Sequence, residues 1–457
     1  MNKSGTLADN RIIRYMILVL VSLVCVSAYL SLEGLFAMEV TVRDPDGLYR
    51  ICDAEYGALS GAYSLLVVFG GVLLLGGPFI DRFGLRISGL ISTALLIAGA
   101  CFVVYSMTET RSMVQLGRSI PVVPLWGQSI RVPILYGIIG FALLGAGSET
   151  IGVILTKILS KWFKDKELAF ALASQIAIGR LGIGVTYGGT PYLLAVFNGN
   201  VSMPLIIGVG LLVIGLLLYL VYCVYDKRLD AQPDSEGAFP ASQGESDRFR
   251  WTDLSVIARS KAFWAICLIC GCYYGAVRKF DNYSVGLVVE RFNILEKAGG
   301  ILPMVTSLTI VVLSPILGII VDKYGKSIDF LVGGALLAVI DFMLLETVLL
   351  PKSLVYAVFV LNGISFSLVA ASLWPLIPRI LPLSIQGTGY AIVFLFQNIV
   401  FLIVPRLVTA VGTESHHYVI VFLSFAILSA VVSVLFLFMD RKNGGELNRT
   451  ENKNTTQ

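Results

Sequence analysis

Two ionisable side chains of opposite sign lie deep inside long apolar stretches of this sequence. Glu149 comes nine residues before the end of the stretch at 132–158, and Arg180 comes twelve residues after the start of the stretch at 168–196. A carboxylate and a guanidinium held a few ångströms apart suit a zwitterion, because the acid takes an ammonium group and the arginine grips a carboxylate through two hydrogen bonds. The pair can instead neutralise itself and only fix helix packing.

Other charged residues within apolar stretches also need a reason, since each costs about 2.5–3.5 kcal/mol on membrane-insertion scales. For Arg278 and Lys279 two interpretations stay open. The side chain of Arg278 snorkels to the outer interface with Asp281 as its partner, or it adds a positive site that favours acidic side chains and other anions. Packing is the expected role of Asp341, and snorkelling that of Arg406.

The elements that carry these residues are membrane spans. The chain has 457 residues, of which 56% are hydrophobic and 14% charged, with a mean hydropathy of +0.83, and this composition excludes a soluble or a disordered protein. A helix of about 20 apolar residues crosses the bilayer core. The sequence predicts an all-α polytopic membrane protein with twelve transmembrane helices, at 12–36, 57–79, 87–107, 132–158, 168–196, 203–225, 262–289, 298–321, 328–349, 354–377, 387–411 and 418–439.

The distribution of charge gives the orientation and the division of the chain. With the N-terminus inside, most of the 34 lysines and arginines fall on the cytoplasmic side, so both termini are predicted to be cytoplasmic. One long polar segment, rich in Pro, Ser and Gly, separates six spans from six. The predicted organisation is an N-terminal six-helix bundle, a cytoplasmic linker, a C-terminal six-helix bundle and a cytoplasmic tail, at 1–225, 226–261, 262–440 and 441–457.

A charged turn occurs twice at equivalent places. Gly77, Asp81, Arg82, Gly84 and Arg86 follow the second span, and Gly318, Asp322, Lys323, Gly325 and Lys326 follow the eighth. Glycine after the acid permits a sharp turn. Internal repeats point to a transporter with its substrate site between the repeats. Six plus six spans with this repeated turn resemble the major facilitator superfamily, and the resemblance implies that Asp81, Arg82, Arg86, Asp322 and Lys323 act in the cytoplasmic gate.

Further islands of sequence resemble the lysosomal dipeptide uniporter branch of that superfamily. They lie in both halves, at 147–150, 161–168, 179–182, 263–264, 270–277, 372–375, 386–390 and 397–398. The resemblance implies that Glu149 holds the amino terminus and Arg180 the carboxyl terminus of a dipeptide. It also implies substrate contacts from Tyr273, Tyr274, Trp374 and Gln397, although aromatic residues in a bundle mostly pack. After Val277 the family is apolar, so Arg278 and Lys279 depart from its pattern.

The sequence therefore predicts a monomeric carrier that moves small zwitterionic peptides by alternating access, as a uniporter or with proton coupling. The alternatives are an organic-anion or drug transporter, in which Arg180, Arg278 and Lys279 act together, and a ligand sensor without flux. No enzyme is expected, since no nucleophile and base occur at suggestive spacing, and no metal site is expected, since Cys267 and Cys270 lie alone in an apolar span. No cofactor or nucleic-acid partner is expected either. The expected location is the cell membrane, or the lysosomal membrane if the family's location holds, and an accessory subunit stays an open alternative.

Overall fold

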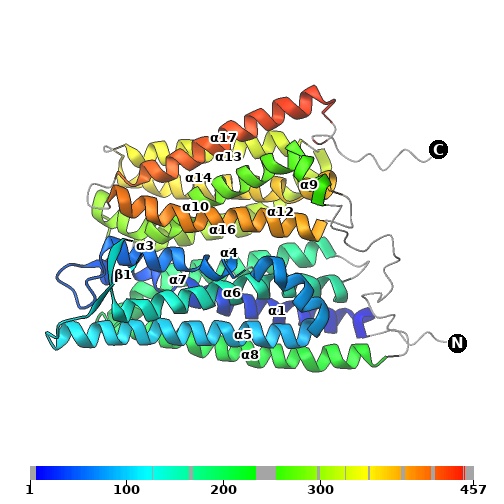
Figure 1. The fold of residues 1–457 in the computed structure, drawn as a ribbon. Coiled ribbons are helices and arrows are strands. Elements are labelled where there is room, and N and C mark those ends of the chain that lie inside the picture. The colour runs from blue at the N-terminus through cyan, green and yellow to red at the C-terminus, as the bar shows by residue number, and fades with distance from the viewer. Residues whose placement is uncertain are drawn as a thin grey trace, which may run out of the picture. The chain divides into compact units, whose positions relative to one another are not determined.

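The chain folds into two compact units, Met1–Arg248 (unit 1) and Phe249–Gln457 (unit 2), and each is built almost wholly of helices (Figure 1). The structure is a computed structural model. It describes residues 7–70, 72–125, 127–163, 168–232, 254–295, 299–324, 326–347, 350–381, 386–412, 417–445 and 447.

Unit 1 contains eight helices and one hairpin of strands among its described residues. The helix α1 begins after Asn10, whose side chain accepts hydrogen bonds from the backbone N–H groups of Ile12 and Ile13. The elements of unit 1 are α1 (Arg11–Glu33), α2 (Glu39–Arg43), α3 (Asp53–Ala62), α4 (Leu65–Val68), α5 (Val72–Gln115), β1 (Val122–Leu125), β2 (Gln128–Arg131), α6 (Val132–Trp162), α7 (Leu168–Val196) and α8 (Ser202–Asp230), with short 3₁₀ turns at Leu7–Asp9 and Phe36–Met38.

Unit 2 repeats this helical build without a hairpin in the part of the chain that is described. Ser260 caps the first long helix by accepting from the N–H of Phe263 at 3.2 Å. The elements are α9 (Leu254–Arg259), α10 (Lys261–Phe292), α12 (Ile301–Tyr324), α13 (Ser327–Glu346), α14 (Lys352–Leu373), α15 (Leu376–Ile380), α16 (Gln386–Val411) and α17 (Val419–Lys442).

The predicted linker at 226–261 is partly helical. Residues 226–230 continue α8, and residues 254–259 form α9. The stretch at 233–253 lies outside the described residues.

Nine helices within the described residues are long and apolar enough to cross a membrane. The predicted spans at 57–79, 168–196 and 262–289 are not among the nine. The first is divided between α3, α4 and the start of α5, while the other two correspond to α7, with 29 residues, and α10, with 32. The all-helical membrane fold agrees with the sequence analysis, and the count of twelve spans stays a prediction.

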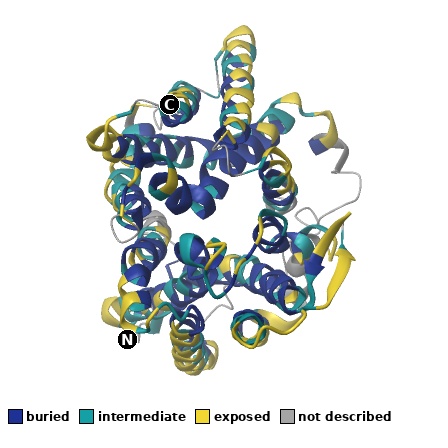
Figure 2. Cartoon of the chain, turned by 90° about the vertical axis from the view of Figure 1, so that its left-hand side faces the viewer, coloured by how far each residue is buried: buried dark blue, intermediate teal, exposed yellow. Residues whose placement is uncertain are grey.

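Large apolar side chains cover the outer faces of the helices. On α12, Val312 is 60% and Ile319 is 68% exposed, and on α17 both Leu435 and Phe438 are 61% exposed. In Figure 2 the helices show buried and exposed faces side by side. Apolar patches of this extent are unusual on soluble proteins and are expected where lipid is the solvent.

Among the described residues of unit 1, two interruptions of the helices concern the predicted gate and site. Gly84 adopts φ +76° inside α5, where it joins two helical segments, and this is the sharp turn expected from the glycine that follows Asp81. The second break is at Tyr63 and Ser64, between the end of α3 at Ala62 and the start of α4 at Leu65.

A buried ion pair joins the first turn of α3 to the hairpin at the end of unit 1 that is predicted to face outward. Glu55, 2% exposed, accepts from the backbone N–H, Nε and Nη2 of Arg131 at 3.0, 2.8 and 2.5 Å. Arg131 also donates to the carbonyl of Tyr49 at 3.0 Å. Burial raises the pKa of the Tyr49 hydroxyl, which stays protonated and donates to Asn200. The loop before α3 is thereby held against the hairpin, which is itself mostly exposed (Figure 2).

We expect Glu55→Gln to destabilise this end of unit 1, because the substitution leaves the Arg131 guanidinium without its countercharge. Breaking a buried ion pair costs about 3–5 kcal/mol, and this appears as a lower midpoint of thermal unfolding of the purified protein. Asp46→Asn, at an exposed position of the loop before α3, is the matched control and is expected to leave the midpoint unchanged. Equal midpoints for the two variants would contradict the assignment.

Candidate functional site

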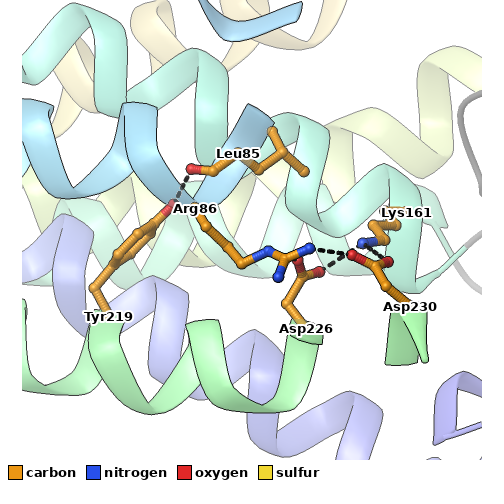
Figure 3. A network of polar contacts seen from close by, with 6 residues as sticks. All are labelled: Leu85, Arg86, Lys161, Tyr219, Asp226 and Asp230. Atoms are coloured by element: carbon orange, nitrogen blue, oxygen red, sulfur yellow. Dashed lines mark hydrogen bonds and ion pairs between the residues drawn. The ribbon is translucent and has the colours of Figure 1, made fainter. Parts of the chain in front are cut away.

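A network of four charged side chains ties together three helix ends in unit 1, at the end predicted to be cytoplasmic (Figure 3). Arg86 of α5 contacts Asp226 of α8 through Nε at 3.1 Å and also pairs with Asp230. Lys161 of α6 lies 2.7 Å from both Asp226 and Asp230. Asp226 is 2% exposed, so one carboxylate is buried between two cations. Arg86, Lys161, Asp226 and Asp230 are called the ion-pair network below.

Glycine allows the helices to come close enough for this network to form. A Cβ atom at Gly89 would lie 1.9 Å from the hydroxyl of Tyr219. The hydroxyl of Tyr219 donates to the carbonyl of Leu85 at 2.8 Å, directly before Arg86 (Figure 3). The contact between α5 and α8 therefore depends on the absence of a side chain at residue 89.

Three residues of unit 1 are predicted to act in a gate, and among them the structure describes the side chain of Arg86. Its ion pairs lie within the unit, so the observed role is to brace α5, α6 and α8. The side chains of Asp81 and Arg82, like those of Asp322 and Lys323 in unit 2, lie outside the described part, and their gating role stays a prediction.

The sequence analysis missed Lys161, Asp226 and Asp230 as partners of Arg86. The signal was present, because Asp226 and Asp230 are four residues apart and so share one face of a helix. It was overlooked because both acids were assigned to the polar linker, whereas α8 continues to Asp230.

Glu149 lies on α6, and its carboxylate accepts a hydrogen bond from the hydroxyl of Tyr63 at 2.7 Å. The side chain of Glu149 is partly exposed. Tyr63 lies at the break between α3 and α4, which brings its ring against α6. A Cβ at Gly145, one turn before Glu149, would lie 1.8 Å from the Tyr63 carbonyl oxygen, so glycine is required there.

Arg180 lies on α7, at a place where α7 packs closely on α1. Cβ atoms built at Gly179 would lie 3.1 Å from Cys25 and from Tyr29, and at Gly182 they would lie 3.2 Å from Val26. Cys25 is close to Arg180 itself. The glycines that surround Glu149 and Arg180 in the sequence therefore serve helix packing at these positions.

Tyr29 connects the surroundings of the two charged residues. It packs against Gly179, next to Arg180, and lies near the hydroxyl of Tyr63, which donates to Glu149. Glu33, one turn beyond Tyr29 on α1, is 3% exposed and accepts from Tyr187 of α7 at 3.2 Å. Unit 1 thus brings Glu149 and Arg180 to helices that meet a common group of tyrosines.

In unit 2, two of the predicted substrate contacts belong to one aromatic cluster. The indole Nε1 of Trp374 donates to the hydroxyl of Tyr274 at 3.1 Å. Trp374 stacks on Phe394 with ring centroids 5.0 Å apart and on Tyr390 at 6.2 Å, while Tyr274 meets Phe366 edge to face. Trp374 is partly exposed and Tyr274 is buried.

Tyr273 and Gln397 have partners inside the helix bundle of unit 2. The hydroxyl of Tyr273 lies 2.7 Å from that of Ser365, which donates to the carbonyl of Gly334 on α13, and Tyr273 is fully buried. Gln397, 8% exposed, lies 3.5 Å from the thiol of Cys270. These contacts favour packing, and a substrate contact from either residue stays a prediction.

The charged residues of α10 have partners close by. Arg278 lies 3.0 Å from Asp281, as the snorkelling interpretation expects, and the ammonium of Lys279 lies 5.2 Å from the ring centroid of Phe401. Asp341 is fully buried in α13, and Arg406 is exposed on α16. Within the described residues, no cluster of three or more His, Cys, Asp and Glu side chains is arranged to hold a metal ion.

Comparison with known proteins identifies the family. The sequence profile of the Major Facilitator Superfamily matches residues 10–405 and, in a second alignment, 282–456. The chain belongs to the Major Facilitator Superfamily. It is a multi-pass membrane transporter of that superfamily and not an enzyme.

Curated relatives include lysosomal dipeptide transporters named MFSD1. The chicken protein (Gallus gallus) is 26% identical over 326 residues, which cover 69% of this chain and 71% of that protein. The human protein (Homo sapiens) is 26% identical over 321 residues, covering 68% and 66%. The bovine protein (Bos taurus) is 24% identical over 453 residues, covering 96% and 88%. The resemblance to the dipeptide branch in the sequence is thus confirmed.

Solved structures show the same fold. A POT family transporter in complex with a thioalcohol-conjugated peptide has a TM-score of 0.66 at 14% identity, covering 93% of this chain and 96% of that one. The nucleoside transporter NupG has a TM-score of 0.61 at 16% identity, covering 93% and 98%. At these identities the likeness concerns the fold alone.

The ion-pair network predicts a difference between two chemically equal substitutions. Asp226→Asn removes a buried carboxylate from between two cations, and the expected loss of stability is about 3–5 kcal/mol. Asp230→Asn removes an acid that meets the same cations but is 37% exposed, so solvent screens it and the expected loss is about 0–1 kcal/mol. Thermal unfolding of the purified variants measures both, and equal losses would show that burial does not determine the strength of the network.

Proposed function

We propose that this transporter moves dipeptides and similar small zwitterionic peptides across the membrane by alternating access. Glu149 binds the amino group of the peptide, and Arg180 binds its carboxylate. The MFSD1 relatives, which are named for dipeptide transport, support this proposal.

The proposal rests on the groups that surround Glu149 and Arg180 in unit 1. The carboxylate of Glu149 is partly exposed and is oriented by a neutral hydroxyl donor, Tyr63. A carboxylate can accept several hydrogen bonds, so Glu149 can take an ammonium while it keeps this contact. Arg180 offers a fork of N–H donors that matches a peptide carboxylate.

The contacts of α10 weaken the organic-anion alternative. That alternative depends on Arg278 and Lys279 joining Arg180 as a positive site. Arg278 instead lies 3.0 Å from Asp281, which cancels its charge locally, and Lys279 lies over an aromatic ring. The zwitterion therefore fits the described charges better than an anion does.

The transporter is proposed to act as a monomer with both termini in the cytoplasm, as the distribution of Lys and Arg indicates. Its membrane is the cell membrane, or the lysosomal membrane if it shares the location named for its relatives. A uniporter needs no further titratable group, whereas proton coupling would use Glu33 or Glu149. Accumulation of labelled dipeptide above its external concentration under an imposed inward proton gradient would indicate proton coupling, whereas a uniporter would only equilibrate the dipeptide across the membrane.

Uptake by proteoliposomes tests the roles of the two charged residues. We expect Glu149→Gln and Arg180→Ala each to reduce initial uptake of a labelled neutral dipeptide about 10- to 150-fold at subsaturating concentration. This corresponds to the loss of about 1.5–3 kcal/mol from a hydrogen bond to a charged group. An N-acetylated dipeptide and a C-terminally amidated dipeptide, added as unlabelled competitors, are expected to inhibit wild-type uptake weakly.

The matched controls carry the same chemical changes at exposed positions. Glu290→Gln on α10 and Arg406→Ala on α16 are expected to transport at the wild-type rate. If Glu149→Gln and Arg180→Ala also transport normally, the two residues serve only helix packing and the proposed site is wrong. Strong competition by acidic, blocked compounds would favour an anion carrier.

A further inference from the structure

Tyr63 lies at an unusual position for a residue of a predicted membrane span. It falls in the short turn between α3 (Asp53–Ala62) and α4 (Leu65–Val68), where the N–H of Ser64 donates to the carbonyl of Gly61, three residues back, in place of the four-residue spacing of an α-helix. Its side chain is partly buried, and it reaches the carboxylate of Glu149 at 2.7 Å. No spacing pattern in the sequence marks this tyrosine.

Two contacts fix Tyr63 on the same face of α6. Its backbone carbonyl approaches Gly145 so closely that a Cβ there would lie 1.8 Å away. Its hydroxyl reaches Glu149, four residues further along α6. Residues four apart in a helix lie one above the other, so the backbone contact and the hydroxyl contact hold the tyrosine at both ends.

Neighbouring hydroxyl groups complete the arrangement. Ser148 lies within hydrogen-bonding reach of the Tyr63 hydroxyl, and Tyr29 of α1 lies near it. Tyr29 packs on Gly179 beside Arg180. A tyrosine hydroxyl that donates to a carboxylate has little freedom to turn its O–H elsewhere.

We propose that Tyr63 is a positioning residue for the amino group of the transported peptide. Its hydroxyl holds the Glu149 carboxylate in one orientation, so that the remaining lone pairs of the carboxylate are directed at the ammonium. This inference rests on the peptide function proposed above and adds to it a residue that determines specificity for the amino terminus.

The orientation of Glu149 has a consequence for selectivity. A carboxylate whose orientation is fixed by a donor is presented to a ligand in a set direction, and a ligand with an N–H donor there avoids the entropy cost of ordering the side chain on binding. A ligand that lacks the amino group gains nothing from this arrangement. We therefore expect loss of the Tyr63 hydroxyl to weaken the binding of peptides and to leave the binding of ligands without an amino group unchanged.

Inhibition of labelled dipeptide uptake measures this selectivity in proteoliposomes with the full-length protein. The competitors are an unlabelled neutral dipeptide and its des-amino analogue, which has the same backbone without the amino group. We expect Tyr63→Phe to raise the inhibition constant of the dipeptide about 5- to 10-fold, with the maximal rate unchanged. The constant for the des-amino analogue should stay at its wild-type value.

A second variant and a matched control keep the test independent of folding. Ser148→Ala removes the hydroxyl next to Tyr63. We expect it to raise the inhibition constant of the dipeptide, relative to that of the des-amino analogue, by a smaller factor of about 2- to 3-fold. Tyr105→Phe makes the identical chemical change at a residue that is 51% exposed on α5, and no shift is expected.

The outcomes distinguish the two levels of the proposal. If wild-type protein shows no saturable dipeptide uptake, the proposed function fails. If wild-type protein transports and Glu149→Gln does not, while Tyr63→Phe changes neither constant, only the role of Tyr63 is wrong. If Tyr63→Phe raises the inhibition constants of both competitors equally, the tyrosine serves packing, and this result would also overturn the inference.

Discussion

Close approach of helices at glycine determines where the polar groups of unit 1 meet. Gly99 on α5 and Gly140 on α6 face each other so closely that a Cβ on either would lie 2.6 Å from the carbonyl oxygen of the other. Gly145 admits the backbone of Tyr63. Without a hydrophobic driving force between helices in lipid, tight packing of this kind carries much of the stability. The hydrogen bond of Glu149 and the network around Arg86 depend on it.

Once the helices are close, burial determines what each charged residue does. Asp226 is buried between Arg86 and Lys161, so its charge is balanced inside the protein and it binds helices together. Arg278 and Asp281 balance each other on α10 in the same way. The contact between Tyr63 and Glu149 is of a different kind, because the donor is neutral and cannot cancel the charge of the carboxylate. The Tyr63 hydroxyl thus orients the Glu149 carboxylate without adding a charge of its own.

Much of the fold was predictable from the sequence, because hydropathy and the repeated turn are strong signals in a membrane protein. Gly84 turns as its position after Asp81 suggested. The partners of Arg86 were missed because a polar linker and the charged last turn of α8 have similar compositions. Tyr63 was not predictable, since its role comes from a helix break and from a contact 86 residues away along the chain. Local sequence carries no record of such a contact.

The two units show how far a repeated sequence can differ in its contacts. Near its end, the last helix of each unit carries an acid followed by two bases, Asp226-Lys227-Arg228 on α8 and Asp440-Arg441-Lys442 on α17.

In unit 2, Asp440 is 3% exposed and its Oδ1 accepts from the backbone N–H of Leu447 at 3.1 Å. Arg379 donates to the carbonyl of the same residue at 3.0 Å. Among the described residues, Oδ2 of Asp440 has no hydrogen-bond partner. The chain after α17 therefore takes the place that two cations take in unit 1. Asp440 therefore accepts from a backbone N–H where Asp226 contacts two cations, and the two helix ends are not interchangeable.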